Sequence, residues 1–156
     1  MIRTVKTGRR GVTFVEVVLV TLVLGIIAAV GIGRYVGALS NHRTAAAARR
    51  VIADLALAQR HAKMTSASQT VTFTAATDTY SMPGISDLDF PAASFTVRLG
   101  RTPYKVDVVS ASFGGDGSVV FDGFGRPDSS GTVVLSSGSS QITIQLDRDT
   151  GLARVL

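Results

Sequence analysis

The side chains that most often carry chemistry are sparse in this chain of 156 residues. It has no cysteine, which excludes a thiolate nucleophile, a disulfide framework and a cysteine-type zinc site. Its two histidines, His42 and His61, fall on an expected helix too far apart to share a metal, and neither has an obvious nucleophile beside it. The glycine-rich segments 113–118 and 122–127 lie between expected strands, so turns explain their glycines. The sequence therefore does not predict an enzyme, and no cofactor is expected.

Asp147 and Asp149 stand two residues apart just before Gly151. Calcium binds through several hard oxygen ligands, which a turning backbone can present together. Two carboxylates are too few without donors from elsewhere, and aspartate-rich hairpin turns are common. The pair is therefore a weak calcium candidate, and a plain turn is the favoured interpretation.

Glu16 is the only glutamate in the chain, and it stands at the start of a long apolar run. It is also the only charged residue between positions 12 and 33. At helical rise this segment extends roughly 33 Å, enough to cross a hydrocarbon core of about 30 Å. A carboxylate in such a segment is retained either because it has a charged partner or because it touches water at the membrane interface.

Residues 1–11 are basic and contain no acid, with Arg3, Lys6, Arg9 and Arg10 supplying the charge. The positive-inside rule places such a leader in the cytoplasm and the rest of the chain outside. Residue properties alone leave three interpretations open: a plain membrane anchor, a secretory signal peptide cleaved near Ala28–Gly31, or a more specialised anchor.

The net charge of +5 belongs to the N-terminal part of the chain. Residues 64–156 contain six basic residues against nine aspartates, so this part is mildly acidic. That distribution argues against a general nucleic-acid-binding surface.

Two kinds of element must position these residues. An alanine-rich segment without proline continues the helix to about Met64, and one apolar stripe repeats along it at three- and four-residue spacing: Ala48, Val51, Leu55, Ala58 and Ala62. Six short strands follow, at 70–75, 94–100, 105–113, 118–123, 132–138 and 141–147, and residues 152–156 return in a final hairpin.

The expected fold is therefore α+β: a long N-terminal helix, beginning near Thr13, packed against an antiparallel β-sheet or sandwich. Four segments are expected, namely a leader at 1–11, a transmembrane helix at 12–33, an amphipathic helical stalk at 34–64 and a β-rich head at 65–156. The helix would lie half in the membrane and half on the head.

The stretch Gly11-Val12-Thr13-Phe14-Val15-Glu16 after a basic leader resembles the type IV prepilin motif. Val12 and Phe14 depart from the commonest residues at their positions but keep the apolar character. The resemblance implies that a prepilin peptidase cuts between Gly11 and Val12 and methylates the new amino terminus. It also implies that Glu16 pairs with the α-amino group of Val12 on a neighbouring subunit of a filament.

Residues 55–73 are similar to the helix end and first strand of the H-type minor pseudopilin and FimT-like family, and residues 119–127 and 142–155 are similar to its late strands. Gln59 departs from that pattern, which usually has alanine directly before the arginine. The resemblance implies a structural subunit of the periplasmic pseudopilus of a type II protein secretion system. The chain would cross the bacterial inner membrane once, with a periplasmic head, and its partners would be other pseudopilins, the prepilin peptidase and membrane lipid.

A FimT-like minor pilin of a type IV pilus, capturing DNA, is the alternative within the same family. Arg148 and Arg154 are the candidate nucleic-acid residues for that role. Isolated arginines beside Asp147 and Asp149 would give weak, salt-sensitive attraction at best. The structural role is therefore favoured, and nucleic acid is not an expected partner.

Overall fold

The structure, a computed structural model, describes residues 11–87 and 93–156, except for the side chains of residues 30–36. Of the expected leader only Gly11 is among the described residues. The chain divides into two compact units, Met1–Val36 and Gly37–Leu156. A single helix, α1 (Phe14–Thr65), contributes residues to both units, and the β-strands all belong to the second.

Helix α1 begins and ends within one residue of the expected bounds. It contains no proline, and its C-terminal half is rich in alanine, the residue with the highest helix propensity. The helix ends where Ser66 adopts a left-handed conformation, with φ of 51°. The amide of Ala67 then donates to the carbonyl of Ala62 over 3.3 Å, a bond typical of a Schellman-type helix end.

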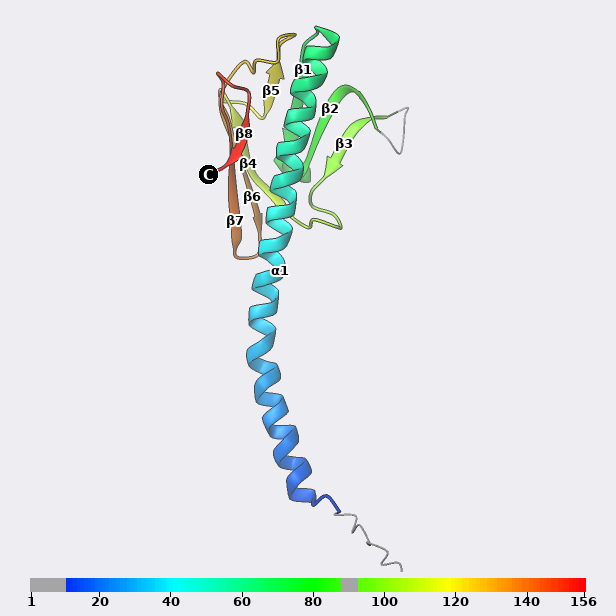
Figure 1. The fold of residues 1–156 in the computed structure, drawn as a ribbon, viewed down its shortest axis with the longest axis vertical. Helices are drawn as coiled ribbons and strands as arrows, with labels where there is room; N and C mark the ends of the chain where they lie inside the picture. Colours follow the sequence, from blue (N-terminus) through cyan, green and yellow to red (C-terminus); the bar gives the residue numbers. More distant parts are fainter. Residues whose placement is uncertain (1–10, 88–92) are drawn as a thin grey trace, which may run out of the picture. The chain divides into compact units, whose positions relative to one another are not determined.

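In the described residues eight strands form two antiparallel sheets, which confirms the α+β fold (Figure 1). The first sheet has the order β3-β2-β1-β5, from β3 (Ser94–Arg98), β2 (Thr79–Ser86), β1 (Gln69–Thr74) and β5 (Ser118–Phe121). The second has the order β4-β6-β7-β8, from β4 (Asp107–Phe113), β6 (Gly131–Ser137), β7 (Ser140–Leu146) and β8 (Ala153–Val155). A short 3₁₀ helix, η1 (Ala75–Thr77), connects β1 to β2.

Strand β2 is the element that the sequence pattern missed. Pro83 and Gly84 interrupt it, and both residues are typical of turns. In the structure they lie where the pairing of β2 with β3 shifts register, between Met82 and Ser86, and Gly84 adopts a φ of 89°. The interruption is therefore a bulge within a strand rather than a boundary between elements.

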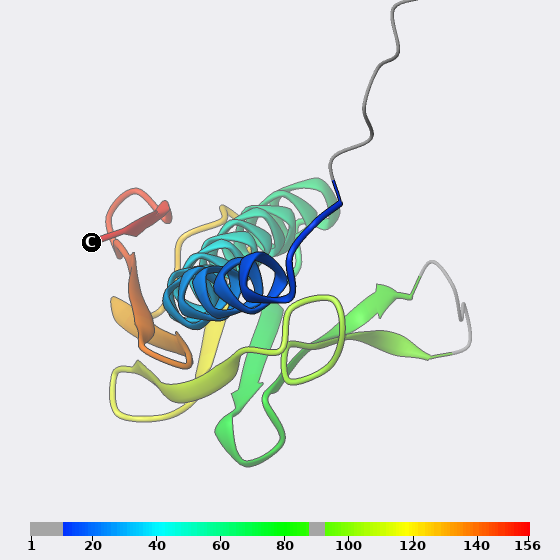
Figure 2. The same ribbon diagram turned by 90° about the horizontal axis from the view of Figure 1, so that it is seen from below.

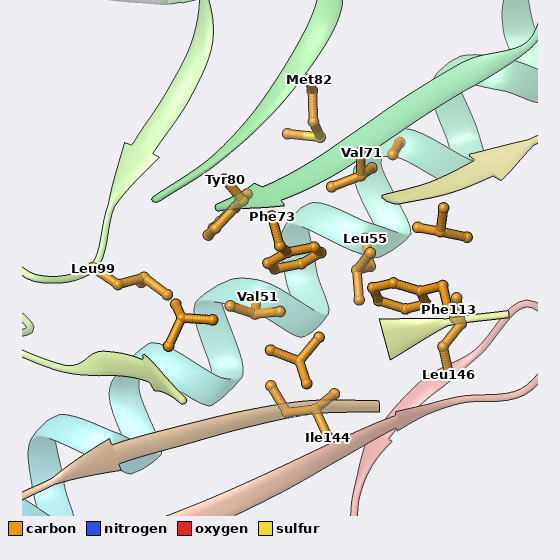
Figure 3. Close-up of a cluster of buried hydrophobic side chains, with 14 of the residues drawn as sticks. Val51, Leu55, Val71, Phe73, Tyr80, Met82, Leu99, Phe113, Ile144 and Leu146 are labelled. Atoms are coloured by element: carbon orange, nitrogen blue, oxygen red, sulfur yellow. The ribbon is translucent and has the colours of Figure 1, made fainter. Parts of the chain in front are cut away.

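The core lies between the helix and both sheets. Figure 2 looks along α1 and shows the two sheets curving around the part of the helix that belongs to the second unit. All five residues of the expected apolar stripe are buried, with exposed fractions of 0–2%. Val51 and Leu55 point toward Phe73, Phe113 and Ile144, which come from the two different sheets (Figure 3).

Aromatic rings continue the core on the sheet side of the helix. The ring of Phe73 lies 5.2 Å from that of Tyr80 within the first sheet. It lies 5.7 Å from that of Phe113, which belongs to the second sheet. Such ring pairs add to the free energy gained from burial.

A buried polar link joins the helix to the first sheet. The hydroxyl of Tyr80 donates to Oδ2 of Asp54 over 2.5 Å, and Nε of Arg50 donates to the same oxygen over 2.8 Å. Burial, together with the Asp54 carboxylate, raises the pKa of Tyr80 far above its ordinary value. Desolvation acts to lower the pKa of Arg50, but the hydrogen bond and charge of Asp54 raise it overall. The Asp54 carboxylate is thus buried together with two donors that satisfy it.

We expect Leu55→Ala to lower the free energy of unfolding by about 2–5 kcal/mol, because it opens a cavity between the helix and the sheets. Leu57→Ala is the matched control, since Leu57 is on the same helix but 39% exposed. Urea unfolding of the full chain in detergent would measure both. Equal losses for the two variants would contradict the assignment of the buried stripe.

Candidate assembly and processing site

The beginning of α1 places Glu16 in the first helical turn. The hydroxyl of Thr13 accepts a hydrogen bond from the amide of Glu16 over 3.3 Å, and the carbonyl of Thr13 accepts from the amides of Glu16 and Val17. Thr13 is therefore the N-cap of the helix. Sequence reasoning did not assign it this role, although threonine followed three residues later by glutamate before an apolar run is the pattern of a capping box.

This position gives Glu16 a favourable electrostatic environment within its own chain. The first turn of a helix carries the positive end of the backbone dipole, which stabilises a carboxylate there. Glu16 is exposed, so its carboxylate is accessible to a partner from another molecule. The site can thus provide an anion for an incoming cation.

Gly11 and Val12 precede the helix in non-helical backbone and are exposed. Val12 is 69% exposed, and a Cβ atom built on Gly11 would meet nothing within 4 Å. The peptide bond between them is therefore accessible, as cleavage by a peptidase requires. Processing at this bond stays a prediction.

The described residues of the first unit present an exposed apolar surface. Large hydrophobic side chains from Val12 to Ile27 are 47–83% exposed, namely those of Val12, Phe14, Val15, Val17, Val18, Leu19, Val20, Leu22, Val23, Leu24, Ile26 and Ile27. Exposed apolar surface of this extent marks an interaction with lipid or with other protein chains. Within the described residues, no helix meets the combined requirement of length and apolarity for crossing a membrane.

Gln59, the residue that departs from the family pattern, joins the helix to two turns of the head. Its side chain is buried, and Nε2 donates to the carbonyls of Gly125 over 2.9 Å and Thr150 over 3.2 Å. Gly151 has a φ of 67°, and a Cβ atom there would lie 2.3 Å from Gln59 Nε2. An alanine at position 59 would leave both carbonyls without this donor, so the departure has a structural reason that the sequence alone did not reveal.

Asp147 organises the turn between β7 and β8. Its Oδ1 accepts from the amides of Asp149 and Thr150 and from the Thr150 hydroxyl, over 2.8–3.0 Å. The hydrogen bonds from Thr150, above all the one from its amide, lower the pKa of Asp147. The amide of Gly151 closes the turn on the carbonyl of Asp147 over 2.9 Å.

The weak calcium candidate formed by Asp147 and Asp149 stays untested. The hydrogen bonds of the turn already use one carboxylate oxygen of Asp147. In the part of the chain that the structure describes, no three His, Cys, Asp or Glu side chains gather as a metal would require. The two histidines both lie on α1, His42 exposed and His61 half-buried.

The candidate nucleic-acid residues lie in different surroundings. Arg148 lines a cavity of about 650 Å³ together with Asp122, Asp128 and Asp149. Arg154, on β8, donates from Nη2 to Oε1 of Gln145 over 3.5 Å and is not part of that lining. The structure thus surrounds one of the two arginines with carboxylates.

The described residues thus contain a helix packed on two antiparallel sheets in the second unit and exposed apolar residues with a glutamate in the first helical turn in the first unit. The sequence profile of the type II transport protein GspH matches residues 47–150, more than half of the chain. The chain belongs to this family, and it is a GspH-like minor pseudopilin.

The matched region runs from the buried part of α1 to the turn after β7, so it does not include the Gly11–Glu16 motif. No curated protein and no solved structure matches the chain.

We expect the hydrogen bonds of Asp147 to make the stability of the head depend on pH. Because the folded-state pKa lies below the ordinary value of 3.8, the contribution is present above that value and is lost as the pH falls through the folded pKa. Asp147→Asn should therefore reduce the difference in urea midpoint between pH 6 and pH 2.5.

Asp149→Asn is the matched control, because its carboxylate receives no hydrogen bond in the described part of the chain. A pH dependence that is unchanged in the Asp147 variant, or equally reduced in the Asp149 variant, would show that the turn is not its source.

Proposed function

We propose that this chain is cleaved between Gly11 and Val12 and then forms a structural subunit of the periplasmic pseudopilus of a type II secretion system. The observation that carries the proposal is the uncovered apolar surface of Val12–Ile27, with Glu16 as its charged residue. A surface of this kind needs a bilayer before assembly and other helices after it. Membership of the GspH family supports the secretion system as the machine in which the subunit acts.

In the membrane, residues 12–33 form the single anchor, and the basic leader remains in the cytoplasm. The β-rich head then lies on the periplasmic side of the inner membrane. The protein performs no reaction in this role. It contributes one helix to the filament interior and one folded head to the filament surface.

Glu16 sets the position of one subunit relative to the next. Cleavage produces a positively charged α-amino group on Val12, and a buried carboxylate is stable in an apolar surrounding only when such a partner is present. If the amino group of one chain pairs with Glu16 of another, both charges are neutralised. The contact joins different surfaces of the two chains, so repeating it generates an open helical assembly rather than a closed ring.

The first experiment is the intact mass and N-terminal residue of the protein extracted from its native membrane. We expect a chain that begins at Val12 and carries one added methyl group on its amino terminus. A chain that begins at Met1 would contradict processing. A chain that begins after Ala28–Gly31 would show a secreted head without its anchor.

We expect Glu16→Gln to leave membrane insertion intact but to reduce incorporation into filaments by about tenfold or more, because the uncharged side chain no longer pairs with an α-ammonium group. Cross-linking of assembled subunits and membrane fractionation would measure the two properties separately. Arg60→Gln is the control, since it removes a charge from an exposed position of the same helix. Normal incorporation of the Glu16 variant would refute the pairing.

A further inference from the structure

Strand β3 forms one edge of the first sheet, where it pairs with β2 on one side only (Figure 1). The amide of Leu99 donates to the carbonyl of Asp78 over 2.8 Å, at the end of this pairing. In an antiparallel pair, every second residue of a strand forms its backbone hydrogen bonds with the neighbouring strand. The amides and carbonyls of Val97 and Phe95 therefore also face β2. The amides and carbonyls of Thr96 and Arg98 consequently point to the open edge. In the described residues no strand pairs with them there.

A groove of about 720 Å³ runs along this edge. Of the described residues, three arginines and one carboxylate line it: Arg50 from α1, Arg98 from β3, Arg101 from the following loop, and Asp87. Arg98 and Arg101 are exposed and form no ion pair within the described parts of the chain. The described lining of the groove therefore has more positive than negative side chains, although the head as a whole is mildly acidic.

Arg50 is fixed in place on the other side of the groove. Its Nε donates to buried Asp54, and its guanidinium lies 5.7 Å from the centre of the Phe95 ring. Its side chain remains 42% exposed. A cation that is held by a buried carboxylate and an aromatic ring, and still reaches solvent, loses little side-chain entropy when it binds an anion.

We propose that the β3 edge is a docking site for an extended, acidic segment of a partner protein, which adds as a further strand to the first sheet. Main-chain groups of Thr96 and Arg98 bond to the added strand, as in other cases of β-strand addition. Side chains on one face of that strand lie beside Arg98, where carboxylates are favoured. Those on its other face lie beside Phe95 and half-buried Val97, where apolar side chains are favoured.

A single-stranded nucleic acid is the competing occupant of a positively charged groove. Such ligands depend on aromatic faces on which bases can stack. Two described aromatic residues line the groove, and neither offers its ring face freely, because Phe95 is 8% exposed and Tyr104 is half-buried. In contrast, the unpaired amides and carbonyls at the edge of β3 can form backbone hydrogen bonds with an extended peptide.

The test uses the full chain in detergent and a fluorescent peptide, acetyl-Thr-Glu-Val-Glu-Val-Glu-Thr-amide, with binding measured by anisotropy. We expect the double variant Arg98→Gln/Arg101→Gln to weaken binding by about fivefold or more through the loss of two exposed ion pairs. Arg126→Gln/Arg148→Gln is the matched control. It removes the same charge from another part of the head and should change the affinity by less than about twofold. Thermal unfolding checks that all variants fold.

A second peptide distinguishes strand addition from simple charge attraction. The same sequence, N-methylated at alternate residues, keeps every carboxylate but loses the amides that would bond to the edge. We expect it to bind about tenfold more weakly than the parent peptide. Equal binding of the two peptides would overturn strand addition, and equal effects of the two double variants would overturn the assignment to this groove.

Three further outcomes would also overturn the proposal. The first is the absence of peptide binding, which would make Arg98 a charge that protects the edge from pairing. The second is tighter binding of a single-stranded oligonucleotide that is sensitive to Arg98 and Arg101. The third is self-association of the chain that Arg98→Gln abolishes, which would make a second copy the occupant. None of these results depends on whether the chain is processed at Gly11 or joins a filament.

Discussion

The burial of one narrow helical stripe between two sheets is the constraint on which the head depends. Each sheet has only four strands, and neither has enough apolar surface of its own to form a core. Alanine predominates in the stripe, with Ala47, Ala48, Ala58 and Ala62 almost fully buried. Small side chains allow the helix to approach both sheets closely. The larger Val51 and Leu55 pack against Phe73 and Phe113, where the two sheets meet (Figure 3).

The same helix meets two different surroundings, and its composition changes accordingly. Up to Ile27 its large side chains, apart from Glu16, are apolar and exposed. From Ser40 onward the apolar residues gather on one face, while Arg49 and Arg60 occupy exposed positions. A helix with apolar side chains on all faces is stable only where apolar groups surround it. A helix with a single apolar stripe needs only one apolar surface to pack against. This change of pattern is what the proposed division of the helix, into an anchor and a part of the globular core, requires.

The sequence was sufficient for the elements with strong local signals. Helix α1 was predicted to within one residue at each end, and most strands were predicted from β-branched runs between turns. Strand β2 was missed because Pro83 and Gly84 are locally turn residues, and only the pairing with β1 and β3 makes that segment a strand. The division of the strands into two sheets also could not be predicted, because it depends on contacts between residues far apart in the chain.

The buried polar residues of the helix were a further feature that could not be predicted from the sequence. Asp54 and Gln59 look like ordinary members of a solvated helix face until Tyr80, Gly125 and Thr150 are found beside them. At the N-terminus, the motif around Glu16 was recognised, but the part that Thr13 plays there was not. A capping residue can be assigned only when the first residue of the helix is known. The periodicity of apolar residues defines the ends of a helix less well than its interior.

The capping geometry changes how the role of Glu16 should be understood. A carboxylate in the first turn is already stabilised by the positive end of its own helix, so the isolated subunit does not hold an entirely uncompensated charge. Transfer into an apolar assembly removes water from that carboxylate, and the helix end alone does not replace it. In the proposed filament a full positive charge from another chain supplies the missing compensation, and only one register of the two chains would bring it to Glu16. Under this proposal the glutamate is compatible with the unassembled subunit and at the same time favours one arrangement of the assembled subunits.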